Sequence, residues 1–378
     1  MTFQDENDYL IHLLYCAIHD TVPETVPPGI SLEKVFEAGK AHEVANIAYR
    51  AVLRLPEQPD PALMSRWRDY YYNAVKRDAL QTKARRELIE ALHSHGIMTL
   101  EVQGTVVKLY YPQRHWRMMS DIDVIIPADK LDEAESVVQA LGYQPFGFQA
   151  RNPNGIEIDV VRENIAVELH TEFFDEESVT RSALDQPFSH AICSEDGTAV
   201  VSDTVFYLFH WLHTIKHCIY IGVGLRRIID LYYLENAMKD KADQAVIDDV
   251  LKQYGFYETK QALLAVKECW FGNGRPGQVS EALKKDILQA GTHGHTDEYI
   301  NRSLVREKKE GKRFVLIRYT LSALFLPKQA LYKLYPFCER HHYPLVLCWI
   351  HRLNCSLFSA KKWKRLGNII KRTRIDKE

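Results

Sequence analysis

The segment "DIDVII" constrains the fold of this chain more than any other part of its sequence. Successive side chains of a β-strand point to opposite faces of a sheet, so Asp121 and Asp123 would share one face. Three of its apolar residues would enter the core from the other face; they are Ile122, Val124 and Ile126. The pattern predicts a strand that is buried on one side and carries two carboxylates on the other.

Two carboxylates on one strand face are a candidate metal site. At close range they repel each other, and one takes up a proton unless a cation lies between them. Oxygen ligands suit Mg²⁺, so we predict that Asp121 and Asp123 hold a magnesium ion. A strand whose polar face is acidic without any metal has the same short pattern, so the surrounding sequence must decide between the two interpretations.

Helix and strand patterns divide the chain into three regions, 1–96, 97–200 and 201–378. The first and last have apolar residues at three- and four-residue spacing, which predicts helices; "SLEKVFEAGKAHEVANIAYRAVL" is expected to be one of them. The middle region alternates short strands and helices, and then continues with strands joined by hairpins. We predict an α+β fold in which a mixed sheet, with its first strands joined by a crossover, is flanked by two helical regions.

Residues before the two aspartates suggest a place for phosphate. Gly104 and Thr105 follow a predicted strand and precede a short predicted helix, whose free N–H groups are suited to phosphate oxygens.

Residues after the aspartates offer a third acid. Glu168 lies in the predicted strand "AVELH", and a third carboxylate completes the ligand set of a two-metal phosphoryl-transfer site. Glu157 and Asp159 share one face of the strand "IEIDVV" and compete with Glu168 for this role. His170 is expected on the same strand face as Glu168, where it would orient a carboxylate or contact substrate.

Four motifs of the sequence resemble an uncharacterised bacterial nucleotidyltransferase-like family with the polymerase-β-like fold. In order, they are "QGTVVKLYYP", "RMMSDIDVII", "ALGY" and "VELH". The similarity extends to "KAHEVANIAYRAVL" before them and to "HWLHTIKHCIYIGVGLRRIIDLYYL", "GTHG" and "LFLPKQALYKLYP" after them. The resemblance implies that residues 97–200 are a nucleotidyltransferase catalytic core.

The same resemblance implies roles for particular residues. The catalytic and metal-binding residues would be Asp121, Asp123 and Glu168, and the nucleotide would contact Gly104, Thr105 and Arg117. The chain departs from the family pattern at Gln103, where the family usually has a lysine, so one positive charge near the phosphates is missing. Arg117 or Lys108 would compensate, although Lys108 equally suits a surface position.

Further substrate-binding candidates lie in the C-terminal helical region. They are His217, Arg226 and Arg227. His217 forms one helix face with His210 and His213, and without a nearby H-E-x-x-H motif or cysteine partner this stripe is expected to face substrate or to pack, not to bind zinc. The arginines would contact phosphate or acceptor, or would instead form a surface ion pair with Asp230.

Composition bears on partners and location. The formal net charge of −2 gives no overall field that would attract nucleic acid or a membrane, so nucleic acid remains possible through the basic tail "KKWKRLGNIIKRTRIDK" but is not indicated. No membrane span is expected, because the apolar segment "FVLIRYTLSALFLP" is short and contains Arg318. Seven scattered cysteines without a C-x-x-C pair predict reduced thiols and a cytoplasmic protein.

The predicted function is magnesium-dependent transfer of a nucleoside monophosphate from an NTP, with ATP as the first candidate, to an acceptor that the sequence does not identify. The alternative is a catalytically inactive nucleotide-binding or interaction protein on the same fold, for which Gln103 is the main argument.

Overall fold

A computed structural model describes residues 3–146, 157–174, 178, 180–274 and 279–291. These residues all belong to one unit, Met1–Gly294. The basic tail, "FVLIRYTLSALFLP" and the helices predicted after residue 291 lie outside the described residues. The division into three regions therefore remains a prediction.

The N-terminal helices are α1 (Glu6–His19), α2 (Leu32–Ala41), α3 (Ala45–Val52) and α4 (Pro61–Ser94). The side chains of Asp5, Ser31 and Asp60 accept hydrogen bonds from backbone N–H groups at the starts of α1, α2 and α4, as N-cap residues do. The single helix predicted across α2 and α3 is wrong. Glu43 adopts φ +53°, in the left-handed region, and this residue cannot continue a right-handed helix.

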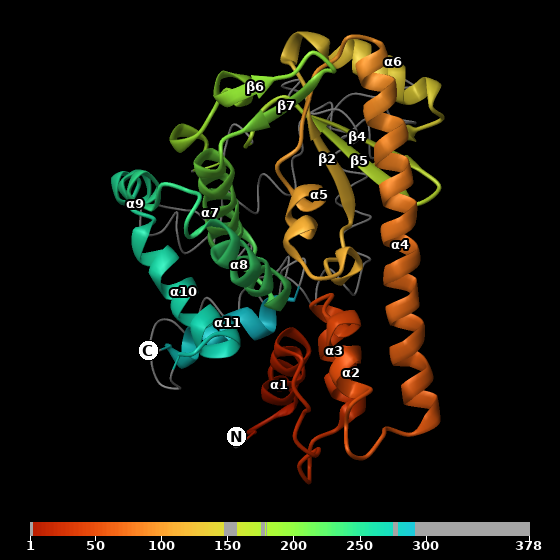
Figure 1. The fold of residues 1–378 in the computed structure, drawn as a ribbon, viewed down its shortest axis with the longest axis vertical. Coiled ribbons are helices and arrows are strands. Elements are labelled where there is room, and N and C mark those ends of the chain that lie inside the picture. Colours follow the sequence, from red (N-terminus) through yellow and green to blue (C-terminus); the bar gives the residue numbers. More distant parts are fainter. Residues whose placement is uncertain (1–2, 147–156, 175–177, 179, 275–278, 292–378) are drawn as a thin grey trace, which may run out of the picture. The chain divides into compact units, whose positions relative to one another are not determined.

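The described strands form one mixed sheet in the order β3-β4-β5-β2-β1-β7-β6 (Figure 1). Their bounds are β1 Thr99–Leu100, β2 Asp121–Ile125, β3 Gln144–Pro145, β4 Glu157–Arg162, β5 Ile165–His170, β6 Ala191–Cys193 and β7 Thr198–Val201. This sheet with its many helices confirms the predicted α+β class.

Two features of the sheet differ from the prediction. The first two strands, β1 and β2, are antiparallel and no parallel crossover joins them; β2 instead pairs in parallel with β5, which follows the β4–β5 hairpin. The strands β6 and β7 were not predicted, and β7 extends the sheet by pairing in parallel with β1.

The remaining helices lie on both sides of the sheet. They are α5 Gly104–Val107, α6 Leu131–Ala140, α7 Asp203–Tyr220, α8 Leu225–Met238, α9 Gln244–Gln253, α10 Tyr257–Phe271 and α11 Glu281–Ala290, with 3₁₀ turns η1 Lys108–Tyr110, η2 Arg114–Trp116, η3 Ala128–Lys130, η4 Arg181–Ala183 and η5 Pro187–His190. Figure 1 shows β2, β4 and β5 between α4 on one side and α5, α7 and α8 on the other. Within the described part of the chain, none of these helices combines the length and apolarity that crossing a membrane requires.

One face of the three central strands is apolar and packs with α4 and α6. The residues of this face are fully or almost fully buried: Ile122, Val124, Ile126, Ile158, Val160, Val167 and Leu169. Leu88 and Leu92 of α4 belong to the same cluster. The predicted assignment of the strand faces is confirmed, so the aspartates of β2 lie on the opposite face.

Truncating Ile126 tests this packing directly. Ile126→Ala is expected to lower the free energy of unfolding by about 2–5 kcal/mol, because it leaves a cavity in a fully buried cluster. Denaturant unfolding measures the loss, and Ile192→Ala on β6, where the isoleucine is 73% exposed, is the matched control. A loss at Ile126 no larger than that at Ile192 would contradict the assignment of the faces.

Candidate active site

A row of three carboxylates crosses the sheet on the face opposite the apolar cluster. Asp123 of β2 is the direct neighbour of Glu168 on β5, and Glu168 is the direct neighbour of Asp159 on β4. Because β5 lies between β2 and β4, Glu168 is the acid on the strand next to Asp123. Strand order thus places Glu168 closer to Asp123 than either acid of β4.

His170 joins this row from the end of β5. Its Nε2 atom lies 3.3 Å from Oδ1 of Asp123 and 3.5 Å from Oε2 of Glu168, and its Nδ1 atom lies 3.8 Å from Oε1 of Glu157. The possible ligand atoms of Asp123, Glu168 and His170 all lie within 4.8 Å of one another. The imidazole therefore contacts carboxylates, which is one of the two roles expected for it.

Acidic residues of this face also approach one another across neighbouring strands, where the carboxylates of Asp123 and Glu168 contribute to one group of clustered ligand atoms. Neighbouring strands lie about 4.8 Å apart, whereas residues i and i+2 of one strand are separated by about 6.6 Å. Asp121 shares its strand face with Asp123 as predicted, but it belongs to neither group of clustered ligand atoms in the described residues. Its carboxylate instead accepts a hydrogen bond from the Ser120 hydroxyl, at 2.7 Å.

The electrostatics of the row favour bound positive charge. Burial raises the pKa of Asp121 and of Asp123; the charge of Glu168 adds to the rise at Asp121, and the charge of Asp121 adds to it at Asp123. Burial by itself would lower the pKa of His170, but hydrogen bonds to Asp123 and Glu168 outweigh it and raise that pKa well above its usual value. The carboxylates therefore stabilise an imidazolium in their midst, as they would another cation.

The outer end of the row is a second acidic cluster. The carboxylate oxygens of Glu157, Asp159 and Glu168 also lie within 4.8 Å of one another. Burial, followed by the charges of Glu157 and Glu168, raises the pKa of Asp159 to about 7. Clustered carboxylates with raised pKa values are a donor set that fits Mg²⁺, so the residues present are compatible with the predicted cofactor.

Gly104 and Thr105 begin the short helix α5, which contacts β2. A side chain at Gly104 would not fit, because a Cβ atom there would lie 2.7 Å from Nη1 of Arg117 and 2.9 Å from the sulfur of Met119. Thr105 is buried, and its hydroxyl has no hydrogen-bond partner among the residues that the structure describes. A buried hydroxyl without a partner is compatible with the predicted nucleotide contact.

Arg117 lies in a buried ion pair with α8. Its Nε and Nη2 atoms donate to the two carboxylate oxygens of Asp230, at 2.8 and 3.0 Å, and the Tyr111 hydroxyl donates to the same carboxylate at 2.7 Å. The pair holds α8 against the segment before β2. The nucleotide contact predicted for Arg117 remains a prediction, and only Nη1 is outside this pair.

Lys108 does not occupy a surface position. It is 2% exposed and forms an ion pair with Asp78 of α4 at 2.5 Å, so the surface alternative for this residue is wrong. The carboxylate keeps the buried ammonium paired, although burial lowers the pKa of Lys108.

The C-terminal candidates lie on α7 and α8. Arg226 pairs with Glu43 and donates to the carbonyl of Met118 at 3.0 Å, and Arg227 lies 3.9 Å from Asp230. Asp230 is 2% exposed, so the prediction of a surface ion pair between Arg227 and Asp230 is wrong, and the pair is buried. The charges of Arg226 and Arg117 oppose the rise in the pKa of Asp121.

The histidine stripe of α7 is buried at His210 and half-buried at His213 and His217. His210 is 3% exposed, and burial lowers its pKa to about 3. The Nε2 atoms of His213 and His217 lie 2.8 Å apart, and burial lowers the pKa of both well below the usual value. Among the described residues the stripe supplies no third metal ligand. The lowered pKa values favour neutral imidazoles, and the substrate contact of His217 is still a prediction.

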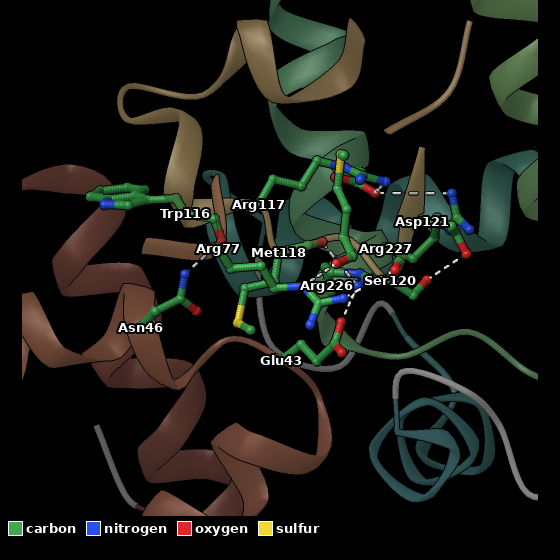
Figure 2. A network of polar contacts seen from close by, with 12 residues as sticks. Glu43, Asn46, Arg77, Trp116, Arg117, Met118, Ser120, Asp121, Arg226 and Arg227 are labelled. Atoms are coloured by element: carbon green, nitrogen blue, oxygen red, sulfur yellow. Dashed lines mark hydrogen bonds and ion pairs between the residues drawn. The ribbon is translucent and has the colours of Figure 1, made fainter. Parts of the chain in front are cut away.

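Several polar residues near the site were not predicted. Arg77 of α4 and Asn46 of α3 donate to backbone carbonyls of the segment that precedes β2 (Figure 2). Gln81 of α4 donates to the carbonyl of Met119 in the same segment. Arg77 and Gln81 are one helical turn apart on the same face, but a charged or amide residue on a long helix is usually solvated, so the sequence carries no signal for this role.

Comparison with known proteins gives one match along most of the chain. The sequence model of a family described as "Uncharacterised nucleotidyltransferase" matches residues 28–272. None of the curated proteins matches. One solved structure, described as "Solution Structure of Antibiotic-Resistance Factor ANT(2'')-Ia Reveals Substrate-Regulated Conformation Dynamics", is 12% identical with a TM-score of 0.34, and the match covers 50% of this chain and 96% of that chain.

Proposed function

Since the chain belongs to the family of uncharacterised nucleotidyltransferases, we propose that it transfers a nucleoside monophosphate from an NTP to an acceptor with the help of Mg²⁺. ATP is the first candidate for the donor, the cytoplasm is the expected location, and the acceptor is not identified. The observation that carries the proposal is the pairing of Asp123 with Glu168 on neighbouring strands. The strand β2 also contacts α5, in which the Thr105 hydroxyl has no partner among the described residues.

The acids differ in exposure, which suggests different roles. The side chain of Asp123 is 11% exposed and that of Glu168 is 32% exposed. Asp121 and Asp123 would hold the cation, and the more open Glu168 would accept a hydrogen bond from the attacking group of the acceptor. Mg²⁺ bound there would neutralise charge on the triphosphate and on the leaving pyrophosphate.

Other residues of the proposed site would bind the phosphates. The absence of a side chain at Gly104 leaves room for Arg117 and Met119 against α5, and the Thr105 hydroxyl would donate to a phosphate oxygen. Arg226 and Arg227 would contribute positive charge from α8 to the phosphates or to the acceptor.

An inactive nucleotide-binding protein is the second candidate, and Gln103 favours it. This residue precedes α5, its side chain makes no capping hydrogen bond to that helix, and it brings no charge to the phosphates. Such a protein would bind an NTP without releasing pyrophosphate, whereas the proposed enzyme does both.

Calorimetric titration with ATP tests the metal site. The wild-type protein is expected to bind ATP in Mg²⁺ and to lose this binding in EDTA, and the Asp121→Asn/Asp123→Asn variant is expected to lose it in either buffer. Because the pKa of both carboxyls is raised, their ionisation opposes folding, so the thermal midpoint of the variant should stay near that of the wild type or rise.

The matched control is Asp129→Asn/Glu133→Gln, which removes two exposed carboxylates from η3 and α6. This control should bind ATP as the wild type does. Unchanged ATP binding by the Asp121→Asn/Asp123→Asn variant would refute the metal site.

A further inference from the structure

The segment before β2 is held by side chains from three different helices (Figure 2). Residues 117–120 have no helix or strand structure, yet they deliver the chain to Asp121. Their carbonyl oxygens and those just before them accept hydrogen bonds from α3, α4 and α8: Asn46 donates to His115 and Trp116, Arg226 to Met118, Arg77 and Gln81 to Met119, and Arg77 to Ser120.

This arrangement has a physical reason. A carbonyl that is buried outside a helix or sheet still needs a donor, and an unpaired one costs free energy. Here the donors are side chains, and the two arginines donate from a charged group, which gives stronger hydrogen bonds than neutral donors do. Such contacts fix the backbone of an irregular segment in one conformation.

Arg77 makes the contact nearest to the acidic row. Its Nε atom donates to the carbonyl of Met119 at 2.9 Å, and its Nη2 atom donates to the carbonyl of Ser120 at 3.0 Å. The rigid guanidinium thus donates to two successive carbonyls, which fixes the orientation of the peptide plane between them. That plane sets the direction of the Ser120 side chain.

Ser120 in turn contacts the side chain of Asp121. Its hydroxyl donates to Oδ2 of the Asp121 carboxylate at 2.7 Å. The negative charge of Glu168 repels this carboxylate, and the hydrogen bond holds the carboxylate in one orientation against that repulsion. The orientation of Asp121 therefore depends on the hydroxyl, and the position of the hydroxyl depends on Arg77.

We propose that Arg77 is a positioning residue of the active site, which acts through the backbone and hydroxyl of Ser120 to direct the Asp121 carboxylate toward the bound metal. The inference rests on the proposed function, because it takes Asp121 to be a metal ligand. It extends that function to a residue on α4 that touches neither metal nor substrate.

Mn²⁺ affinity, measured by electron paramagnetic resonance on the full chain without nucleotide, tests the inference. Arg77→Met and Ser120→Ala are each expected to weaken Mn²⁺ binding about 10- to 100-fold, as changes next to metal ligands do. Arg77→Lys keeps the charge but not the two-pronged contact, so it should weaken binding less. Arg77 is proposed to act through Ser120, so the effects of the two substitutions should not add. The double variant should bind Mn²⁺ about as strongly as whichever single variant binds it less well.

Two control variants separate positioning from charge and from stability. Arg86→Met removes an exposed arginine of the same helix, whose partner Glu90 is 4.0 Å away at the surface. Lys260→Met removes a buried cation of α10 that pairs with Asp248. This variant controls for a loss of stability that does not involve the segment before β2. Both should bind Mn²⁺ as the wild type does.

The possible outcomes separate the inference from the function on which it rests. If the wild type binds no Mn²⁺, the metal site itself fails. If the wild type binds Mn²⁺ and Arg77→Met binds it as the controls do, the positioning role fails, and additive losses in the double variant also overturn it. Should Arg77→Met not fold, Ser120→Ala decides alone, since it removes one hydroxyl, and unchanged Mn²⁺ affinity in that variant overturns the inference.

Discussion

Replacing Glu168 by glutamine is expected to slow nucleotidyl transfer by about 10²- to 10⁴-fold, the usual effect of removing a positioned base, while NTP affinity changes little. The reason is that Glu168 would act on the attacking group, whose charge develops only in the transition state. Asp121 and Asp123, in contrast, would also hold the ground-state nucleotide. Pyrophosphate release gives the rate, and ATP titration gives the affinity of the variant.

The acids of β4 provide the controls for this prediction. Asp159 faces Glu168 across β4 and β5, so it is separated from Asp123 by a whole strand. Asp159→Asn and Glu157→Gln should therefore reduce the rate only weakly. An inactive Asp159→Asn together with a nearly normal Glu168→Gln would show that β4 supplies the third acid.

The second large effect is expected on stability, at the buried carboxylate of α8. Asp230→Asn leaves Arg117 without its counter-charge in the interior and should lower the free energy of unfolding by about 3–5 kcal/mol. Urea unfolding measures this loss.

An exposed ion pair is the comparison for this variant. Asp20 is 71% exposed and pairs with Arg54, so Asp20→Asn should cost no more than about 1 kcal/mol. Equal losses in the Asp230 and Asp20 variants would mean that the Arg117–Asp230 pair does not hold α8 in place.

The sequence predicted those parts of the structure that depend on short-range periodicity. The alternation in "DIDVII" and "AVELH" placed Ile122, Val124, Ile126, Val167 and Leu169 on one face, and all of them are buried there. The break at Glu43 was missed because a left-handed residue is unusual for glutamate and leaves no mark in the pattern. β6 and β7 are three and four residues long, too short for alternation to distinguish them.

The contacts of the site depend on pairings that no local pattern contains. Arg117 and Asp230 are 113 residues apart in the sequence, and their pairing follows from the packing of α8 against the segment before β2. The proximity of Glu168 to Asp123 was also not evident, because a contact between neighbouring strands depends on strand order and not on spacing along the sequence. Only the register of β2 against β5 brings Glu168 to Asp123.

The central claim is that this chain transfers a nucleoside monophosphate, and the fate of the α-phosphate tests it most directly. The protein would be incubated in Mg²⁺ with a cell extract as the source of acceptor and with ATP labelled at either the α- or the γ-phosphate. We expect label from the α-phosphate to appear on an acceptor, with pyrophosphate released, and we expect Glu168→Gln to abolish both. Transfer of label from the γ-phosphate, or incorporation that is equal in the wild type and Glu168→Gln, would contradict the proposed function.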